Sequence, residues 1–191
     1  METLAIHTKS ANLSEEQFFR LCADNKELRI ERDKNKNIII MSPTGTNTGK
    51  INLSIASLLW LWNKKNNTGF CFDSSTGFIL PDGSMRSPDV SWISKARWEQ
   101  VPANEKERFA HICPDFIIEL RSKSDTLKQQ KEKMQEWMAN GVRLAWLIDL
   151  ENKTTIIYKQ HTETAEQLFT ETLLGETVLS GFELKLNEII N

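Results

Sequence analysis

Two uninterrupted apolar runs on either side of a helical segment constrain the fold of this chain more than any other feature. The runs are Phe116–Ile118 and Leu144–Ile148, and each suits a strand that is covered on both faces. Between them, residues 127–140 carry apolar side chains at helical spacing, and Gly141 suits a helix C-cap. A strand, a helix and a second buried strand in this order predict a mixed α/β sheet.

Upstream segments predict two more helices and a hairpin. Ser14 and Gln17 form a capping-box pattern, which is typical of a helix start. Residues 28–32 and 38–41 are strand-like and flank a turn-rich stretch, so they predict a β-hairpin. Apolar residues then recur at helical spacing over residues 48–63, which indicates a second, amphipathic helix.

Short strand-like pieces fill much of the remaining chain. They cover residues 70–73, 77–80 and 89–93, and further short strands are expected after residue 167. No internal repeat, low-complexity stretch or linker divides the sequence, and 191 residues suffice for one substantial core. We therefore expect a single domain over residues 1–191, of the α/β (α+β, mixed-sheet) class, with a β-rich C-terminal extension.

The charge and the cysteine pattern argue against several classes of protein. The formal net charge is −2, from 24 basic and 26 acidic residues, whereas proteins that coat nucleic acid nonspecifically rely on many basic contacts to phosphates. The three cysteines are widely spaced and the histidines are isolated from one another, so neither a disulfide scaffold nor a structural zinc site is expected. Any metal would be bound by oxygen, which favours Mg²⁺ or Mn²⁺.

The apolar runs and the start of the chain predict no association with a membrane. The longest runs, such as Ile38–Met41, are too short to span a bilayer. Residues 1–10 lack the basic end and the apolar stretch of a signal peptide. We therefore expect a cytoplasmic protein.

Two acids stand at the ends of strand-like segments. Asp89 follows Pro88, a residue that favours extended backbone before it, so the carboxylate can project from a rigid strand edge. Glu119 ends an apolar run, and a carboxylate there must be paired, hydrogen-bonded or coordinated to a metal. Arg121 lies two residues further on and would face the same side of a strand, so a Glu119–Arg121 ion pair is the alternative to a metal site.

A lysine on the following helix completes the pattern. Lys131 and Lys133 border the apolar stripe of the helix on opposite sides, and either could extend over the core with its ammonium at the sheet edge. Helical geometry alone does not choose between them. Two carboxylates and a lysine suit a magnesium-dependent phosphodiesterase, in which the acids hold the cation and the lysine neutralises charge or orients the attacking water.

Three other acids fit this pattern less well. Asp115 also follows a proline, but on one strand it would lie at the opposite end from Glu119, too far away to share an ion. Asp149 stands at the end of an apolar run, where turn-forming aspartates are common. Glu31, in the expected hairpin, could supply an additional metal carboxylate, although the sequence does not fix its distance from the site.

Three motifs in combination resemble those of one bacterial family. They are SPDVSWI at residues 87–93, PDFIIELRSKSD at 114–125 and the segment Lys133–Asp149, which contains GVRLAWLID. With them the chain resembles the Uma-type putative restriction endonuclease family, within the PD-(D/E)XK nuclease superfamily. Met41–Gly45 and Ser74–Phe78 also match, so the resemblance covers nearly the whole sequence.

The resemblance implies an αβββαβ core with a metal site at its centre. Asp89 and Glu119 would hold the metal together with the main-chain carbonyl of Leu120. In this family the lysine comes from the helix after the glutamate, and the alignment places that role at Lys133 rather than at Lys131.

This chain shares one departure from the superfamily motif with its family and has others of its own. In this family the residue two positions after Glu119 is not the lysine of the superfamily motif, and here it is Arg121. Close relatives have proline where this chain has Lys123, and they often have glutamine where it has Lys131. Close relatives have tyrosine where this chain has Trp137, so the aromatic side chain is kept but a hydroxyl is lost.

The expected activity is metal-dependent hydrolysis of nucleic-acid phosphodiester bonds, with DNA as the expected substrate. The metal would activate a water, Lys133 would position it, and Arg121 would hold Glu119 or contact the nucleic-acid backbone. Duplex cleavage needs two active sites, so a homodimer is expected. The alternatives are a nuclease-fold module that binds nucleic acid without cleaving it and an oligomeric assembly protein; the near-neutral charge and the displaced lysine support them.

Overall fold

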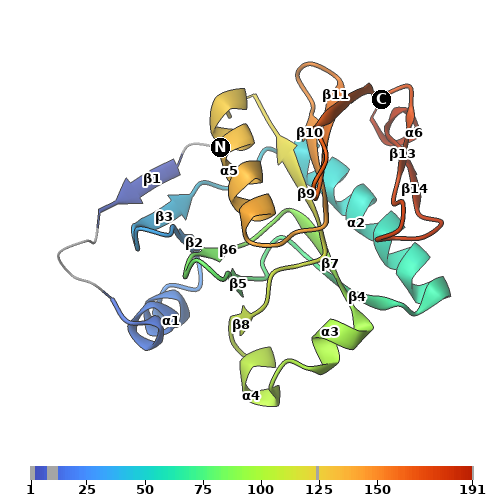
Figure 1. The fold of residues 1–191 in the computed structure, drawn as a ribbon. Helices are drawn as coiled ribbons and strands as arrows, with labels where there is room; N and C mark the ends of the chain where they lie inside the picture. The colour runs from blue at the N-terminus through green and yellow to red at the C-terminus, as the bar shows by residue number, and fades with distance from the viewer. Residues whose placement is uncertain (1–2, 8–12, 124, 191) are drawn as a thin grey trace.

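A mixed sheet covered by a helix on each face forms the centre of the molecule (Figure 1). The structure is a computed structural model that describes residues 3–7, 13–123 and 125–190. In these residues the helices, in chain order, are α1 (Glu15–Asp24), α2 (Thr46–Asn66), α3 (Lys95–Glu99), α4 (Ala103–Lys106), α5 (Leu127–Ala139) and α6 (Leu186–Ile189).

The central sheet has the strand order β12-β11-β10-β9-β7-β4. Its strands are β4 (Gly69–Phe72), β7 (Val90–Ser94), β9 (Phe116–Arg121), β10 (Leu144–Asp149), β11 (Thr154–Lys159) and β12 (Ala165–Leu168). β9 and β10 run parallel, and the other neighbours run antiparallel. The succession α2-β4-β7-β9-α5-β10 is the αβββαβ core that the resemblance implied, so the predicted mixed α/β class is confirmed.

The alternation of side chains along β9 shows how this sheet is covered on both faces. Phe116 belongs to the same apolar cluster as Ile55 of α2, whereas Ile117 belongs to the cluster that contains Trp137 of α5. Successive residues of a strand point to opposite faces, so Glu119 follows Ile117 on the α5 face. The core strand therefore delivers a carboxylate beneath α5.

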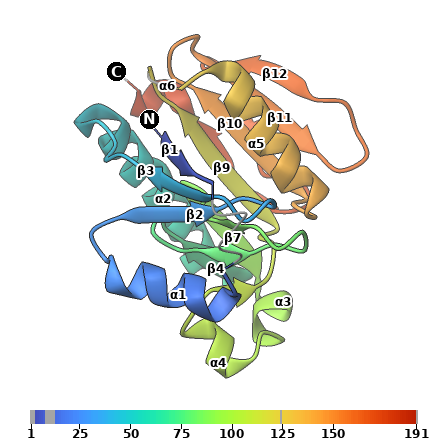
Figure 2. The same ribbon diagram turned by 90° about the vertical axis from the view of Figure 1, so that its left-hand side faces the viewer.

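A second sheet carries the N-terminal part of the described chain, with the strand order β1-β3-β2-β6-β5-β8. Its strands are β1 (Thr3–Ile6), β2 (Arg29–Arg32), β3 (Ile38–Met41), β5 (Phe78–Ile79), β6 (Met85–Arg86) and β8 (Ala110–His111). The predicted hairpin is confirmed, because β2 pairs antiparallel with β3. β2 also meets β6 through Arg32 and Met85, which places the hairpin beside the segment that leads to Asp89. Figure 2 views the molecule from the side of this hairpin.

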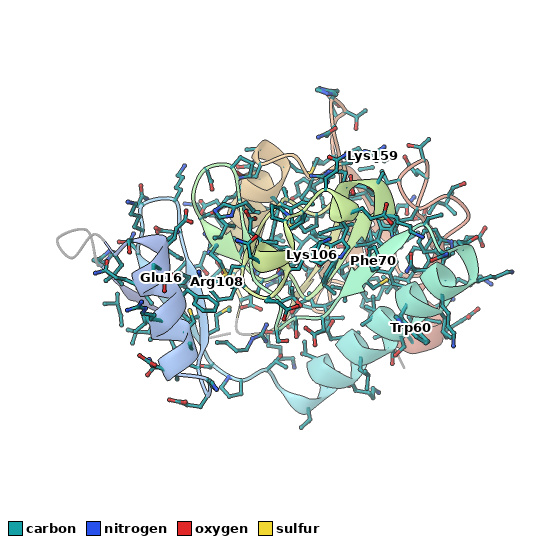
Figure 3. The ribbon with its side chains drawn as sticks, turned by 90° about the horizontal axis from the view of Figure 1, so that it is seen from below. Glu16, Trp60, Phe70, Lys106, Arg108 and Lys159 are labelled. Atoms are coloured by element: carbon teal, nitrogen blue, oxygen red, sulfur yellow. The ribbon has the colours of Figure 1, made fainter. Side chains whose placement is uncertain are left out.

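The first helix begins as its sequence predicts, and charged side chains link it to the rest of the molecule. The backbone N–H of Gln17 donates to Ser14 Oγ at 3.2 Å, and the N–H of Ser14 donates to Gln17 Oε1 at 2.8 Å. Arg108, in the segment after α4, forms an ion pair with Glu16 of α1, and Figure 3 shows the two side by side. His111 of β8 adds a contact to Glu15 at 3.0 Å.

α2 is longer than expected, since it covers Thr46–Asn66 rather than residues 48–63. It ends where Asn67 adopts the left-handed conformation that commonly follows a helix. Ile51, Ile55 and Leu59 bury its inner face against the central sheet. Within the described residues, no helix combines the length and the apolarity that crossing a bilayer requires.

The C-terminal segment closes the α2 side of the core. It forms a hairpin of β13 (Thr172–Leu174) and β14 (Glu183–Lys185), followed by α6. Leu173, Leu184 and Leu186 are buried in the same cluster as the inner residues of α2. The predicted β-rich C-terminal extension is therefore present.

Candidate active site

The two predicted acids meet because β7 and β9 are antiparallel neighbours. Val90 pairs with Ile118 at the end of this ladder, so the same register, continued by one residue, sets Asp89 opposite Glu119. Side chains that lie directly opposite in an antiparallel pair have Cβ atoms about 5 Å apart. Both residues also share the α5 face of the sheet, because each is one step out of phase with Val90 and Ile118.

The proline before Asp89 ends the pairing of β7 with β9. Continued by one more residue, the register sets Pro88 opposite Leu120, and proline has no N–H to donate. The N–H of Leu120 donates instead to Asp89 Oδ2 at 2.8 Å. Since the N–H and C=O of a strand residue point the same way, the Leu120 carbonyl faces the same opening, and Pro88 offers it no donor.

Lys133 reaches this pair of acids from α5. Its Nζ lies 2.9 Å from Glu119 Oε1 and 3.0 Å from Glu119 Oε2, and 3.5 Å from Glu31 Oε1. The Lys133 side chain is only 20% exposed, whereas Lys131 is exposed on the outside of the helix. Of the two lysines that the sequence left open, it is Lys133 that the structure places against Glu119.

Trp137 holds the same carboxylate one turn further along α5. Its indole Nε1–H donates to Glu119 Oε1 at 2.8 Å, and the side chain is fully buried. Residues four apart lie on one face of a helix, so Lys133 and Trp137 approach Glu119 together. The hydroxyl that relatives carry here is absent, but an indole N–H supplies a donor to Glu119.

Glu31 and Arg86 extend this group of charged side chains beyond Lys133. Glu31 is 2% exposed, and its Oε2 accepts from Arg86 Nη1 at 2.8 Å. Arg86 also donates from Nε and Nη2 to the two oxygens of Glu136, at 3.0 and 2.7 Å. Sequence reasoning missed Arg86, which lies between the strand-like pieces that the sequence predicted, in the two-residue strand β6.

Arg121 lies outside this group of side chains. The predicted alternative to a metal site, an ion pair between Arg121 and Glu119, is wrong. Arg121 Nη1 donates to both oxygens of Asp149, at 2.7 and 2.8 Å, and its Nε donates to the carbonyl of Asp125. The physical reason is position: Arg121 ends β9 directly beside Asp149 of β10, while Lys133 and Trp137 already occupy Glu119. Asp149 also accepts N–H bonds from the following turn, as a turn-forming aspartate does.

The clustered side chains open into a cleft of about 710 Å³ between the β2–β3 hairpin and α5. Its charged lining consists of four basic residues and seven acidic ones, a net charge of −3. The basic residues are Arg29, Lys34, Arg86 and Lys133, and the acidic ones are Glu31, Asp82, Asp89, Glu119, Asp125, Glu132 and Glu136. A cleft of this charge attracts cations before it attracts phosphate.

Burial and mutual repulsion disfavour the charged forms of the two central acids. Burial raises the pKa of Glu119 to about 7, and the neighbouring Asp89 carboxylate adds to the increase while Lys133 opposes it. Burial likewise raises the pKa of Asp89, against the N–H bond from Leu120. For Lys133 burial lowers the pKa, but Glu119, Glu31 and Asp89 outweigh it and hold the pKa above its ordinary value. The ammonium therefore stays charged.

The donor set fits a hard divalent cation. Asp89, Glu119 and the Leu120 carbonyl supply oxygen only, and Mg²⁺ is typically bound by one or two carboxylates with waters in its remaining positions. In the part of the chain that the structure describes, no group of three or more His, Cys, Asp or Glu side chains is arranged to hold a metal. A cation held here would have Asp89, Glu119 and the Leu120 carbonyl as its protein ligands and water in its other positions.

Comparisons with known proteins identify the family and the fold of this chain. A family model described as "Uma2: Putative restriction endonuclease" matches residues 15–187. A crystal structure described as a putative nuclease belonging to DUF820 from Anabaena variabilis has a TM-score of 0.75 and 20% identity, covering 93% of this chain and 97% of that one. It shows the same fold. No curated protein matches the sequence.

A second solved structure, described as a cryo-EM structure of a DrdV–DNA complex, is more distant. It has a TM-score of 0.38 and 11% identity, and the match covers 60% of this chain and 10% of that one. A similarity at this level carries no conclusion about fold or function.

Proposed function

This chain belongs to the Uma2 family, as its motifs predicted, and from that premise we propose that it is a metal-dependent nuclease that hydrolyses phosphodiester bonds of DNA. The observation that carries the proposal is the meeting of Asp89, Glu119 and Lys133 at the floor of an open cleft. The strand β9, the residue directly before β7 and the helix α5 bring these side chains together, and burial raises the pKa of both acids, which a bound cation would oppose.

Each of these residues has a definable task in such a reaction. Asp89, Glu119 and the Leu120 carbonyl would hold Mg²⁺ or Mn²⁺, which supplies a bound water of lowered pKa and stabilises charge on the phosphate. Lys133 carries a permanent positive charge into the site, where its N–H groups can orient the attacking water or donate to a phosphate oxygen. Trp137 keeps Glu119 in one orientation through its indole N–H.

The rim of the cleft supplies contacts suited to a phosphate backbone. Arg29 and Lys34, both from the β2–β3 hairpin, line the cleft on the side opposite α5. Phosphate contacts of this kind position a nucleic acid without reading its sequence. Because one such site cuts one strand, we propose a homodimer for duplex cleavage, and a cytoplasmic protein as the setting.

A second candidate is a nuclease-fold module that does not cleave, and one observation favours it. Lys133 and Trp137 together occupy both oxygens of Glu119, so the acid is fully satisfied without a metal. In that case the cluster would be a buried structural network, and the cleft would bind nucleic acid or a partner protein. The two candidates differ in whether a divalent cation changes the chemistry of the protein.

Cleavage of supercoiled plasmid in Mg²⁺ or Mn²⁺ tests the proposal. We expect the wild-type chain to nick or linearise the plasmid, and Glu119→Gln and Lys133→Ala to lose this activity by on the order of a hundredfold or more. Lys131→Ala is the matched control, because it removes an exposed lysine from the same helix and should cut normally. If the wild-type chain and the three variants all leave the plasmid equally uncut with and without the metal, the result would support the module that does not cleave.

A further inference from the structure

Lys133 has two carboxylate partners, and only one of them is a proposed metal ligand. Its ammonium contacts Glu119 at 2.9 Å and Glu31 at 3.5 Å. Glu119 comes from the central sheet, whereas Glu31 comes from β2 of the hairpin on the other side of the cleft. The ammonium therefore lies between two acids that belong to different sheets.

Glu31 is held by two hydrogen bonds that do not involve Lys133. Its Oε2 accepts from Arg86 Nη1 at 2.8 Å, and its Oε1 accepts from the N–H of Ser87 at 3.0 Å. Arg86 is itself held by a two-point contact with Glu136. Burial acts to raise the pKa of Glu31, but Lys133 and Arg86 outweigh it, so the pKa lies below its ordinary value and the residue remains a carboxylate.

These bonds make Glu31 a poor metal ligand and a good anchor. Both of its oxygens already accept hydrogen bonds, one from Arg86 and one from the N–H of Ser87. Breaking these bonds would leave a buried charge or a backbone N–H without a partner, which is unfavourable. Its bond to the N–H of Ser87 also holds the loop that delivers Asp89, two residues later. Glu31 thus contacts both the lysine of the site and the backbone beside the first acid.

Lys133 and Trp137 already make three contacts to the two oxygens of Glu119, so a divalent cation there competes with the ammonium and repels it. A buried ammonium that is displaced from Glu119 needs another negative partner. Building on the proposed function, we propose that Glu31 is a positioning residue that retains Lys133 when Glu119 binds a divalent cation. It keeps the ammonium inside the site while freeing Glu119.

A double-mutant cycle on the affinity for Mn²⁺ tests this role without using cleavage as the readout. The dissociation constant is measured by titration calorimetry for the full chain, for Glu31→Gln, for Lys133→Met and for the double variant. We expect Glu31→Gln to weaken Mn²⁺ binding by about tenfold, the lower end for residues that orient metal ligands. The Lys133→Met variant has no ammonium to retain, so adding Glu31→Gln to it should weaken Mn²⁺ binding by only about threefold or less.

Equal losses in both backgrounds would overturn the inference, because they would make Glu31 a direct ligand or a simple source of negative potential. An unchanged affinity in Glu31→Gln would overturn it as well. Glu136→Gln is the matched control: it removes the other carboxylate bound to Arg86 without touching Lys133, and should change the affinity by less than about twofold. If Glu31→Gln does not fold, Glu31→Asp replaces it. We expect Glu31→Asp to weaken Mn²⁺ binding by a smaller factor, and to have no effect on the affinity when it is combined with Lys133→Met.

The cycle separates this inference from the proposed nuclease activity. A wild-type chain that binds no Mn²⁺ would overturn both. Mn²⁺ binding with equal losses in the two backgrounds would overturn only the role of Glu31. The expected coupling in a protein that fails to cleave plasmid would support Glu31 and contradict the nuclease.

Discussion

The same dipeptide, proline followed by aspartate, precedes the neighbouring strands β7 and β9, and its two copies have opposite surroundings. Asp115, just before β9, is fully buried; Arg97 lies 3.0 Å away, Arg143 lies 3.6 Å away, and the N–H of Ser94 donates to it at 2.9 Å. Asp89, opposite the other end of β9, is half-buried, accepts one N–H bond and faces a second acid, Glu119.

The difference lies in what neutralises the carboxylate. Two arginines of the protein balance Asp115, so its charge serves to hold β9, β10 and α3 together. At Asp89 the nearest cation, Lys133, is already shared by Glu119 and Glu31, which leaves an excess of negative charge beside an open cleft. An acid pair that lacks its own counter-charge, rather than the dipeptide, marks the candidate site.

The largest expected effect separates the two aspartates by activity. Asp89→Asn should lower plasmid cleavage by on the order of a thousandfold, because it removes a proposed metal ligand. Its melting temperature should stay level or rise, since the amide oxygen can still accept from Leu120 and repulsion with Glu119 disappears. Cleavage at the wild-type rate would show that Asp89 holds no metal that cleavage requires.

Asp115→Asn should have the reverse profile. Removing this charge leaves two arginines facing a neutral amide, and we expect a loss of about 2 kcal/mol in the free energy of unfolding, less than for a fully buried pair because both arginines are partly exposed. Urea denaturation measures this loss. Cleavage per folded molecule should stay within about twofold of wild type, and a large loss would assign Asp115 to the site.

The pH dependence of Mn²⁺ binding tests whether the pKa of Glu119 is raised. The pKa of Glu119 is raised to about 7, so protons compete with the metal below that pH. The affinity should therefore fall by about tenfold from pH 8 to pH 6, as the deprotonated fraction falls. Calorimetry at both values measures the change, and Glu119→Gln, which has no proton to lose at this position, should show a flatter profile.

The smallest expected effect concerns the donor that orients Glu119. Trp137→Phe removes the indole N–H from a buried carboxylate and should cost about 1 kcal/mol of stability beyond the lost volume. Trp146→Phe is the matched control, because Trp146 is equally buried and its Nε1 has no acceptor among the described residues. Equal melting temperatures for the two variants would argue that the hydrogen bond to Glu119 contributes nothing.

Local sequence pattern was sufficient to predict the central strand–helix–strand unit and to single out the two acids of the candidate site. The apolar runs of β9 and β10 and the stripe of α5 are signals within single segments, and they carry Glu119 and Lys133 with them. Asp89 was accessible because Pro88 and Asp89 come directly before a strand-like segment, the strand β7. The choice of Lys133 over Lys131 required the family resemblance, since both border the same stripe.

Contacts between distant segments explain what the sequence did not predict. Arg121 was expected to face Glu119, but parallel pairing with β10 places Asp149 beside it, and that register is set by the whole sheet. Arg86 and Glu31 meet only because β6 and β2 pair through residues 85 and 32. A pairing this short leaves no periodic signal in either segment.

The proposed metal site can be observed in an anomalous difference map from crystals soaked in Mn²⁺. We expect one strong peak bound by Asp89 and Glu119, with the Lys133 ammonium moved away from Glu119. A map with no peak at these carboxylates under saturating Mn²⁺, or with Lys133 still bonded to both Glu119 oxygens, would contradict this expectation.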